Sequence, residues 1–209
     1  ADPDRFVDLD ADLPLTLLDQ KRSGKLLLLV TNSDWGYTQA MMGYAFDRYL
    51  PKGTAWRDLF DLVIVEARKP AFFSGRQAVY RLADEAQGLL QPHHGALESG
   101  RVYAGGDAHL VESSLGLSGA QIFYVGDHLF GDVHVSKAML RWRTGLVLRE
   151  IEPEVRALEA SRAADARLGE LMSRKVQLDA RLARLRLERQ RRELGYGPGA
   201  AGRSGRTVE

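Results

Sequence analysis

Short apolar runs alternate with polar segments along this chain. Residues 25–30, 62–65 and 122–125 are continuous apolar runs or nearly so, each too short for a membrane span. Runs of this length are typical of strands that are buried on both faces, as in a parallel sheet. The pattern therefore predicts three buried strands, and residues 144–148 predict a last strand.

The segments between the predicted strands show helical and turn patterns. Residues 37–50 place Met41, Met42, Ala45 and Phe46 on one face, which indicates a helix. Alternation around a Gly-containing turn predicts a β-hairpin over residues 77–92. Further helices are expected from near Ser33, over 107–117 and over 133–141.

After Pro153 the pattern changes to a long Arg-, Glu-, Leu- and Ala-rich stretch. Leucines with heptad spacing form a seam there: Leu168, Leu171, Leu178, Leu182 and Leu185. Lys175 interrupts this seam. This predicts a long amphipathic helix or a helical hairpin, which either packs on its own domain or forms an oligomer contact. We expect a core at residues 1–152, a helical extension at 153–194 and a flexible tail at 195–209.

Composition narrows the classes of function. A length of 209 residues with 44% hydrophobic positions allows one domain of about 150 residues plus an appendage. The net charge of +1 argues against a nucleic-acid or membrane role that depends on bulk charge. The absence of cysteine excludes disulfides and zinc-thiolate sites and is compatible with a cytoplasmic location, and no targeting or lipidation motif is found.

Candidate chemistry follows the third strand, where Gly126-Asp127 and Gly131-Asp132 place two acids five positions apart. Ligands bind at the carboxyl ends of strands in open α/β sheets, and Mg²⁺ prefers such hard oxygen ligands. The same residues also suit a tight turn with a helix N-cap. The segment is therefore a candidate Mg²⁺ site with a simpler structural alternative.

Polar residues also follow the first two strands. Thr31, Asn32 and Ser33 precede an expected helix start, whose free N–H groups suit a phosphate. Lys69 follows the second strand and could neutralise a phosphate oxygen. Helix capping and a solvated surface charge are the simpler explanations for these residues.

Taken together, these motifs closely resemble the haloacid dehalogenase superfamily, in its cytosolic purine 5′-nucleotidase branch. The resemblance covers residues 13–151. The matching segments are Thr31-Asn-Ser-Asp34, Ala67-Arg-Lys-Pro70 with Phe72-Phe73, Gly100-x-Val102-Tyr103-x-Gly105-Gly106, Gly126-Asp-His-x-Phe-Gly-Asp132 and Trp142-Arg-Thr144. It implies a three-layer, doubly wound Rossmann-like α/β fold and Mg²⁺-dependent hydrolysis of purine nucleoside 5′-monophosphates through an aspartyl-phosphate.

The resemblance also implies roles for individual residues. Thr31 and Asn32, with Ser33 beside them, would hold the phosphoryl group, and Lys69 would stabilise the charge of the phosphorylated intermediate. Asp127 would ligate Mg²⁺ and Asp132 would support the metal shell. His128, which lies between them, is expected to orient loop groups near the metal rather than to ligate it.

One element of the family pattern is missing. The nucleophile belongs to an Asp-x-Asp-x-Thr motif after a central strand, but Asp8-Leu-Asp10-Ala-Asp12 follows no such strand and is expected to be the exposed leader of a helix. The family's cap domain is missing as well. Without the central strand, the strands at 25–30 and 122–125 would face each other across unpaired backbone groups, which are costly to bury.

Two functions remain open at this point. The chain is either the part of a 5′-nucleotidase that lacks the nucleophile, or a non-catalytic phosphate or Mg²⁺ binder or helical assembly module. In the first case the missing strand is truncated, or is supplied from outside. We expect a soluble cytoplasmic protein that binds neither nucleic acid nor membrane and can form homo-oligomers through its carboxyl-terminal helix.

Overall fold

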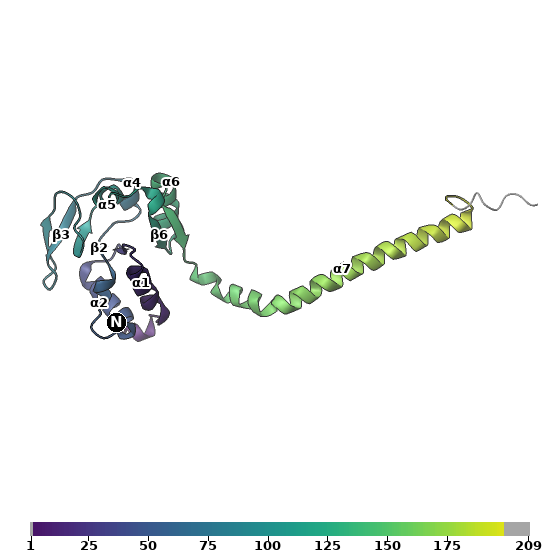
Figure 1. The fold of residues 1–209 in the computed structure, drawn as a ribbon, viewed down its shortest axis with the longest axis horizontal. Helices are drawn as coiled ribbons and strands as arrows, with labels where there is room; N and C mark the ends of the chain where they lie inside the picture. Colours follow the sequence, from purple (N-terminus) through teal and green to yellow (C-terminus); the bar gives the residue numbers. More distant parts are fainter. Residues whose placement is uncertain (1, 199–209) are drawn as a thin grey trace, which may run out of the picture. The chain divides into compact units, whose positions relative to one another are not determined.

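The computed structural model describes residues 2–198, in two compact units at residues 1–147 and 148–209 (Figure 1). Each unit is described by itself. The first unit is a mixed α/β body with a parallel-rich central sheet, and the second contains one long helix. In the part of the chain that is described, no helix combines the length and apolarity that crossing a membrane requires. Most of the tail expected at 195–209 lies outside the described residues.

Five strands form the larger sheet, in the order β1-β2-β5-β3-β4. Their bounds are β1 Leu28–Val30, β2 Leu62–Val65, β3 Val79–Asp84, β4 Leu89–Pro92 and β5 Arg101–Gly105. Strands β1, β2 and β5 are parallel, whereas β3 pairs antiparallel with both β5 and β4. The predicted strand at 62–65 and the predicted hairpin are therefore confirmed. Strand β5 was not predicted, although its residues form part of a recognised motif.

Two strands form a separate sheet. Strand β6 (Phe123–Gly126) pairs in parallel with β7 (Arg143–Leu146). Neither pairs with the larger sheet, so β1 and β6 each keep one unpaired edge. This is the division into two sheet parts that the missing central strand predicted.

Helices cover both faces of the larger sheet. Their bounds are α1 Asp12–Arg22, α2 Trp35–Phe46, α3 Trp56–Leu59, α4 Ala71–Ser74, α5 Ala108–Leu115 and α6 Val135–Leu140. Single helical turns of 3₁₀ type lie at Pro3–Arg5, Asp47–Tyr49, Gly119–Gln121 and Arg149–Ile151, and a π-helical turn lies at Leu129–His134. The helix expected over residues 37–50 begins at Trp35 and gives way to a 3₁₀ turn after Phe46. It is capped by Asp34, whose carboxylate accepts a hydrogen bond from the N–H of Tyr37 at 2.8 Å.

Strand β2 divides the core into two clusters. Val63 and Val65 pack on one face with residues of α1, α2 and α3, while Leu62 and Ile64 pack on the other face with residues of α4, α5 and α6. Because side chains alternate along a strand, a strand with helices on both faces is apolar throughout. This explains why β2 was recognisable in the sequence.

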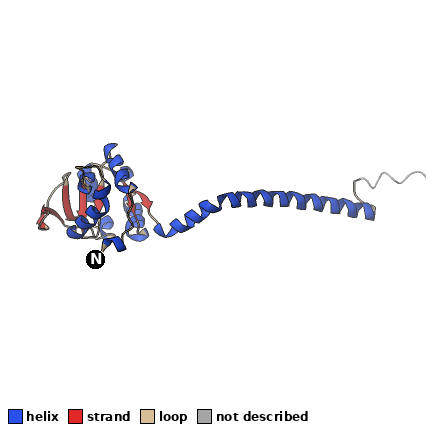
Figure 2. Ribbon diagram, turned by 90° about the horizontal axis from the view of Figure 1, so that it is seen from below, coloured by secondary structure: helices blue, strands red, loops and turns tan. Residues whose placement is uncertain are grey.

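The second unit contains helix α7 (Glu152–Leu194), which is 43 residues long. It is continuous, so the alternative of a helical hairpin is wrong (Figure 2). Its end is marked by Gly195, which adopts the left-handed conformation with φ +72°. Ion pairs three or four residues apart, such as Arg167–Glu170 and Lys175–Asp179, support the helix along its surface.

Candidate active site

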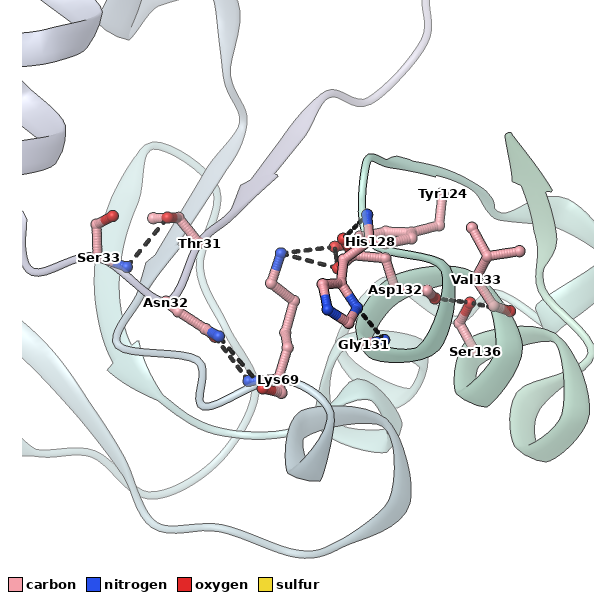
Figure 3. A network of polar contacts seen from close by, with 10 residues as sticks. All are labelled: Thr31, Asn32, Ser33, Lys69, Tyr124, His128, Gly131, Asp132, Val133 and Ser136. Atoms are coloured by element: carbon pink, nitrogen blue, oxygen red, sulfur yellow. Dashed lines mark hydrogen bonds and ion pairs between the residues drawn. The ribbon is translucent and has the colours of Figure 1, made fainter. Parts of the chain in front are cut away.

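Lys69 lies at the centre of a polar network beyond the carboxyl ends of β1, β2 and β6 (Figure 3). Its Nζ atom is 3.0 Å from Oδ1 of Asp132 and donates a hydrogen bond of 3.0 Å to the hydroxyl of Tyr124. The side chains of Lys69 and Asp132 are 16% and 4% exposed. A cation is thus fixed in a largely dry position, where its charge acts more strongly than in water.

Asp132 is held through both of its carboxylate oxygens. Oδ1 accepts from the hydroxyl of Tyr124 at 2.9 Å, and Oδ2 accepts from the N–H of His128 at 3.2 Å. Burial alone would raise the pKa of this carboxyl, but the hydrogen bonds from Lys69 and Tyr124, with the charge of Lys69, outweigh it and lower the pKa. Asp132 therefore stays ionised and paired with Lys69.

Tyr124 was missed by the sequence analysis. Burial raises the pKa of its hydroxyl, and the negative charges of Asp132 and Asp127 raise it further. The hydroxyl remains protonated, so it donates to Asp132 while it accepts from Lys69. A tyrosine two residues before Gly126-Asp127 was the available signal, but its apolar neighbours suggested only a buried strand.

Asn32 positions the backbone of Lys69. Its side-chain Oδ1 accepts from the Lys69 N–H at 2.6 Å, and its Nδ2 donates to the Lys69 carbonyl at 3.2 Å. Nearby, the N–H of Ser33 donates to the hydroxyl oxygen of Thr31 at 3.1 Å. Residues that follow β1 and β2 are thereby brought together.

The backbone around Lys69 is strained. Glu66 and Arg68 adopt positive φ values of 48° and 57°, which residues with a Cβ rarely do. Strained conformations of this kind gather at functional sites, where the surrounding structure enforces them. Arg68 lines a hollow of about 620 Å³ together with Arg76, Gln77 and Tyr80, whereas Lys69 is not among its lining residues.

The chain is packed closely at Gly126 and at Gly131. A Cβ on Gly126 would lie 2.5 Å from the Cβ of Asp132, so a side chain there would displace the buried carboxylate. Gly131 donates its N–H to Nδ1 of His128 at 2.8 Å, which closes the turn ahead of Asp132. The Ser136 hydroxyl, also missed in the sequence, donates to the Asp132 carbonyl.

Asp127 differs from Asp132 in its exposure and in its contacts. It is exposed, and its carboxylate accepts no hydrogen bond from the described residues. Among those residues, no group of three Asp, Glu, His or Cys side chains lies close enough to hold a metal ion. Of the two acids predicted to bind or support Mg²⁺, Asp127 is therefore accessible and Asp132 is engaged by Lys69, and the magnesium site itself stays a prediction.

The Asp8–Asp12 segment lies at the start of α1. The Asp10 carboxylate accepts from the N–H groups of Asp12 and Leu13, at 2.8 and 3.3 Å. An aspartate that holds the first free N–H groups of a helix is a helix cap. The segment is thus the leader of α1, as expected.

Fold and site together define an α/β protein that carries a largely buried lysine–aspartate pair beyond the carboxyl ends of its parallel strands. The chain belongs to the 5′ nucleotidase family, which it matches over residues 1–200. It is 36% identical over 137 residues to the human 5′-nucleotidase domain-containing protein 2, covering 65% of this chain and 25% of that protein. The rat protein of the same name is 36% identical over 137 residues, covering 65% and 23%. The chain thus spans about a quarter of the length of these curated relatives.

Proposed function

We propose that this chain supplies the phosphate-binding and charge-neutralising part of a cytoplasmic, haloacid dehalogenase-like 5′-nucleotidase that hydrolyses purine nucleoside 5′-monophosphates. The observation that carries the proposal is Lys69, whose ammonium group is fixed by Asp132 and Tyr124 and whose backbone is fixed by Asn32. Phosphoryl transfer depends mainly on positioning and on charge neutralisation. Family membership supports the class of phosphoric monoester hydrolases.

Lys69 would neutralise the phosphoryl oxygens. Because its side chain is already ordered and largely buried, it would not have to reorganise as negative charge develops. Asp132 would hold the ammonium group in place through the ion pair, and the Tyr124 hydroxyl would link both side chains through its two hydrogen bonds.

Thr31, Asn32 and Ser33 would hold the phosphoryl group from the β1 side. The hydroxyls of Thr31 and Ser33 lie on the segment whose Asn32 side chain is bonded to the backbone of Lys69. Phosphate oxygens bound there would therefore lie within reach of the cation. Short hydroxyl side chains next to a helix start are a common phosphate-binding arrangement.

Mg²⁺ would be held by Asp127, with Asp132 supporting the loop rather than ligating the ion. Mg²⁺ commonly takes one or two protein carboxylates and completes its shell with water and substrate phosphate, so a single exposed carboxylate fits that role in part. The ion would supply further neutralisation of phosphate charge when bound. The remaining ligand would come from outside the described residues.

The nucleophile would come from a strand inserted between β1 and β6. Both strands have an unpaired edge, and Leu28 and Val30 of β1 pack on the same core cluster as Tyr124 of β6. Phe123 and Val125 of β6 are 61% and 53% exposed, which is unusual for an apolar strand. A parallel strand in this position would end beside Asn32 and Lys69, where an aspartate could attack the phosphorus and form the aspartyl-phosphate.

A complementation experiment tests this proposal. Purified residues 1–209 should not release phosphate from purine nucleoside monophosphates in the presence of Mg²⁺. Co-expression with a segment that carries the family's Asp-x-Asp-x-Thr strand should restore turnover. Turnover by the chain alone, abolished by Asp8→Asn or Asp10→Asn, would contradict the proposal and place the nucleophile in the leader of α1.

In the complemented enzyme, Lys69→Met should lower the rate by about 10², the scale expected when one preorganised charge donor is lost. Arg68→Met is the matched control and should be much milder, because Arg68 faces the neighbouring hollow and takes no part in the Lys69 network. A larger loss of rate for Arg68→Met than for Lys69→Met would show that Arg68, and not Lys69, is the catalytic cation.

A second candidate is a non-catalytic phosphate or Mg²⁺ binder. The capping role of Asp10 favours this candidate, because an Asp-x-Asp motif that caps α1 does not supply a nucleophile to the site. Calorimetric titration of residues 1–209 with phosphate and with Mg²⁺ measures this function directly. Binding that persists in a complemented but inactive protein would favour this candidate over the enzyme.

A further inference from the structure

Helix α7 carries a seam of leucines with heptad spacing. With Leu168, Lys175 and Leu182 at one core position and Leu171, Leu178 and Leu185 at the other, the seam spans residues 168–185. The five leucines are between 45% and 57% exposed. A helix that repeats apolar residues every three and four positions is suited to pair with another helix.

We propose that two copies of this chain pair through α7 as an antiparallel coiled coil, an interface that is independent of the proposed phosphate chemistry. In this register Leu168 of one copy faces Leu185 of the other, and Leu171 faces Leu182. Lys175 faces Leu178 close to the centre of the pair. The orientation is set by charge, as the flanking residues show.

Lys175 disfavours the parallel arrangement. In a parallel, in-register pair, residues at the same core position face each other, so two Lys175 ammonium groups would meet inside the seam. In the antiparallel pair the lysine faces a leucine, and its stem can cover apolar surface while the ammonium group remains outside. The Nζ atom already bonds to Asp179 of its own helix at 3.1 Å, which shows the side chain directed out of the seam.

The residues that flank the seam point to the same orientation. Antiparallel pairing places Asp165 against Arg186 and Arg167 against Glu188, and each of these opposite-charge contacts occurs twice by symmetry. Its one unfavourable contact is Arg174 against Arg181.

Parallel pairing reverses this balance. It places Arg181 against Arg186 and Glu188 against Glu193, and it gains only Arg174 against Asp179. Like charges that flank a coiled coil select against an orientation, so antiparallel pairing is favoured.

Sedimentation equilibrium of the 209-residue chain tests the pairing. The mass should rise to that of a dimer as concentration increases, and Leu178→Glu should keep the chain monomeric. Leu187→Glu is the matched control, because Leu187 is 42% exposed but lies off the seam, and it should dimerise like the unmodified chain. A monomer at every concentration, or equal effects of the two variants, would overturn the proposal.

Charge reversal tests the orientation. Arg186→Glu should raise the dissociation constant about tenfold, since it places two acids together in the antiparallel pair. Adding Asp165→Arg should restore the original affinity. In a parallel pair Arg186→Glu would instead relieve a repulsion and tighten binding, so tighter binding would refute the antiparallel arrangement.

Spin labels give a direct measurement of the same geometry, because the chain contains no native cysteine. With a rise of 1.5 Å per residue, labels at Ala180→Cys should lie about 10 Å apart along the axis, and labels at Ala166→Cys about 32 Å apart. Equal short distances at both positions would show a parallel pair and overturn the proposal.

Discussion

Strands β2 and β6 are both largely apolar segments, but they differ in how deeply they are buried. All four residues of β2 are buried, whereas β6 alternates between exposed and half-buried positions. Strand β2 lies between β1 and β5 with core clusters on both faces, and β6 has β7 as its one sheet neighbour. The burial of an apolar strand thus depends on its neighbours as much as on its own residues.

The two sheets are also stabilised differently. The larger sheet rests on apolar burial around β2, whereas two strands alone bury too little surface to be stable. The smaller sheet is tied to the body by the ion pair of Lys69 and Asp132 and by the ring of Phe73, which lies 5.1 Å from that of Tyr124 and 5.7 Å from that of Trp142. Trp142 belongs to the core cluster on one face of β2 and Tyr124 packs against it, so the smaller sheet combines this apolar packing with the ion pair.

The largest effect should come from breaking the contact between the sheets. Asp132→Ala leaves the buried ammonium group of Lys69 without its counter-charge and should lower the free energy of unfolding by about 3 kcal/mol. Asp127→Ala, which changes an exposed acid in the same segment after β6, should alter the free energy of unfolding by less than about 0.5 kcal/mol. Urea unfolding of both variants measures the difference, and similar losses would mean that Asp132 does not hold the sheets together.

A matched pair of valines tests the burial of the two strands. Val63→Ala in β2 removes a fully buried side chain and should cost about 2 kcal/mol, while Val125→Ala in β6, which is 53% exposed, should cost less than about 0.5 kcal/mol. The denaturant midpoints of the two variants measure both losses of stability. The contrast should narrow when the complementing strand is present, because Val125 would then be covered; an unchanged contrast would argue against insertion at β6.

The hydroxyl of Tyr124 should contribute less to the free energy of unfolding than the carboxylate of Asp132 or the side chain of Val63. Tyr124→Phe keeps the aromatic contact with Phe73 but removes the bridge between Lys69 and Asp132, so we expect a loss of about 1 kcal/mol. Tyr80→Phe, on the exposed side of the hairpin, is the control and should be neutral. Thermal unfolding of the two proteins provides the comparison, and a neutral Tyr124→Phe would show that the ion pair holds without the bridge.

The smallest effect concerns pH. Because the pKa of Asp132 is lowered in the folded state, its contribution to stability is present above the unfolded value of about 3.9 and is lost as pH falls through the folded pKa. The unmodified chain should therefore lose stability below about pH 4 more steeply than Asp132→Asn does. Unfolding curves taken across this range check the prediction, and parallel curves would contradict it.

Much of the fold and part of the site could be predicted from local pattern. The apolar run of β2, the hairpin and the heptads of α7 depend on spacing within a few residues, which the sequence displays directly. The division into two sheets was also predicted, from the central strand that the family resemblance implies between residues 25–30 and 122–125.

Other features were decided by contacts between distant segments. Asn32 bonds to the backbone of Lys69 across 37 positions, and Lys69 bonds to Tyr124 across 55. No local spacing marks such partners, since they meet only when strand ends converge. The sequence therefore determined which residues could serve the site, while the tertiary structure decided that Asp132 is paired with Lys69 and Asp127 remains open to solvent, because burial and the partners of a carboxylate arise only from packing.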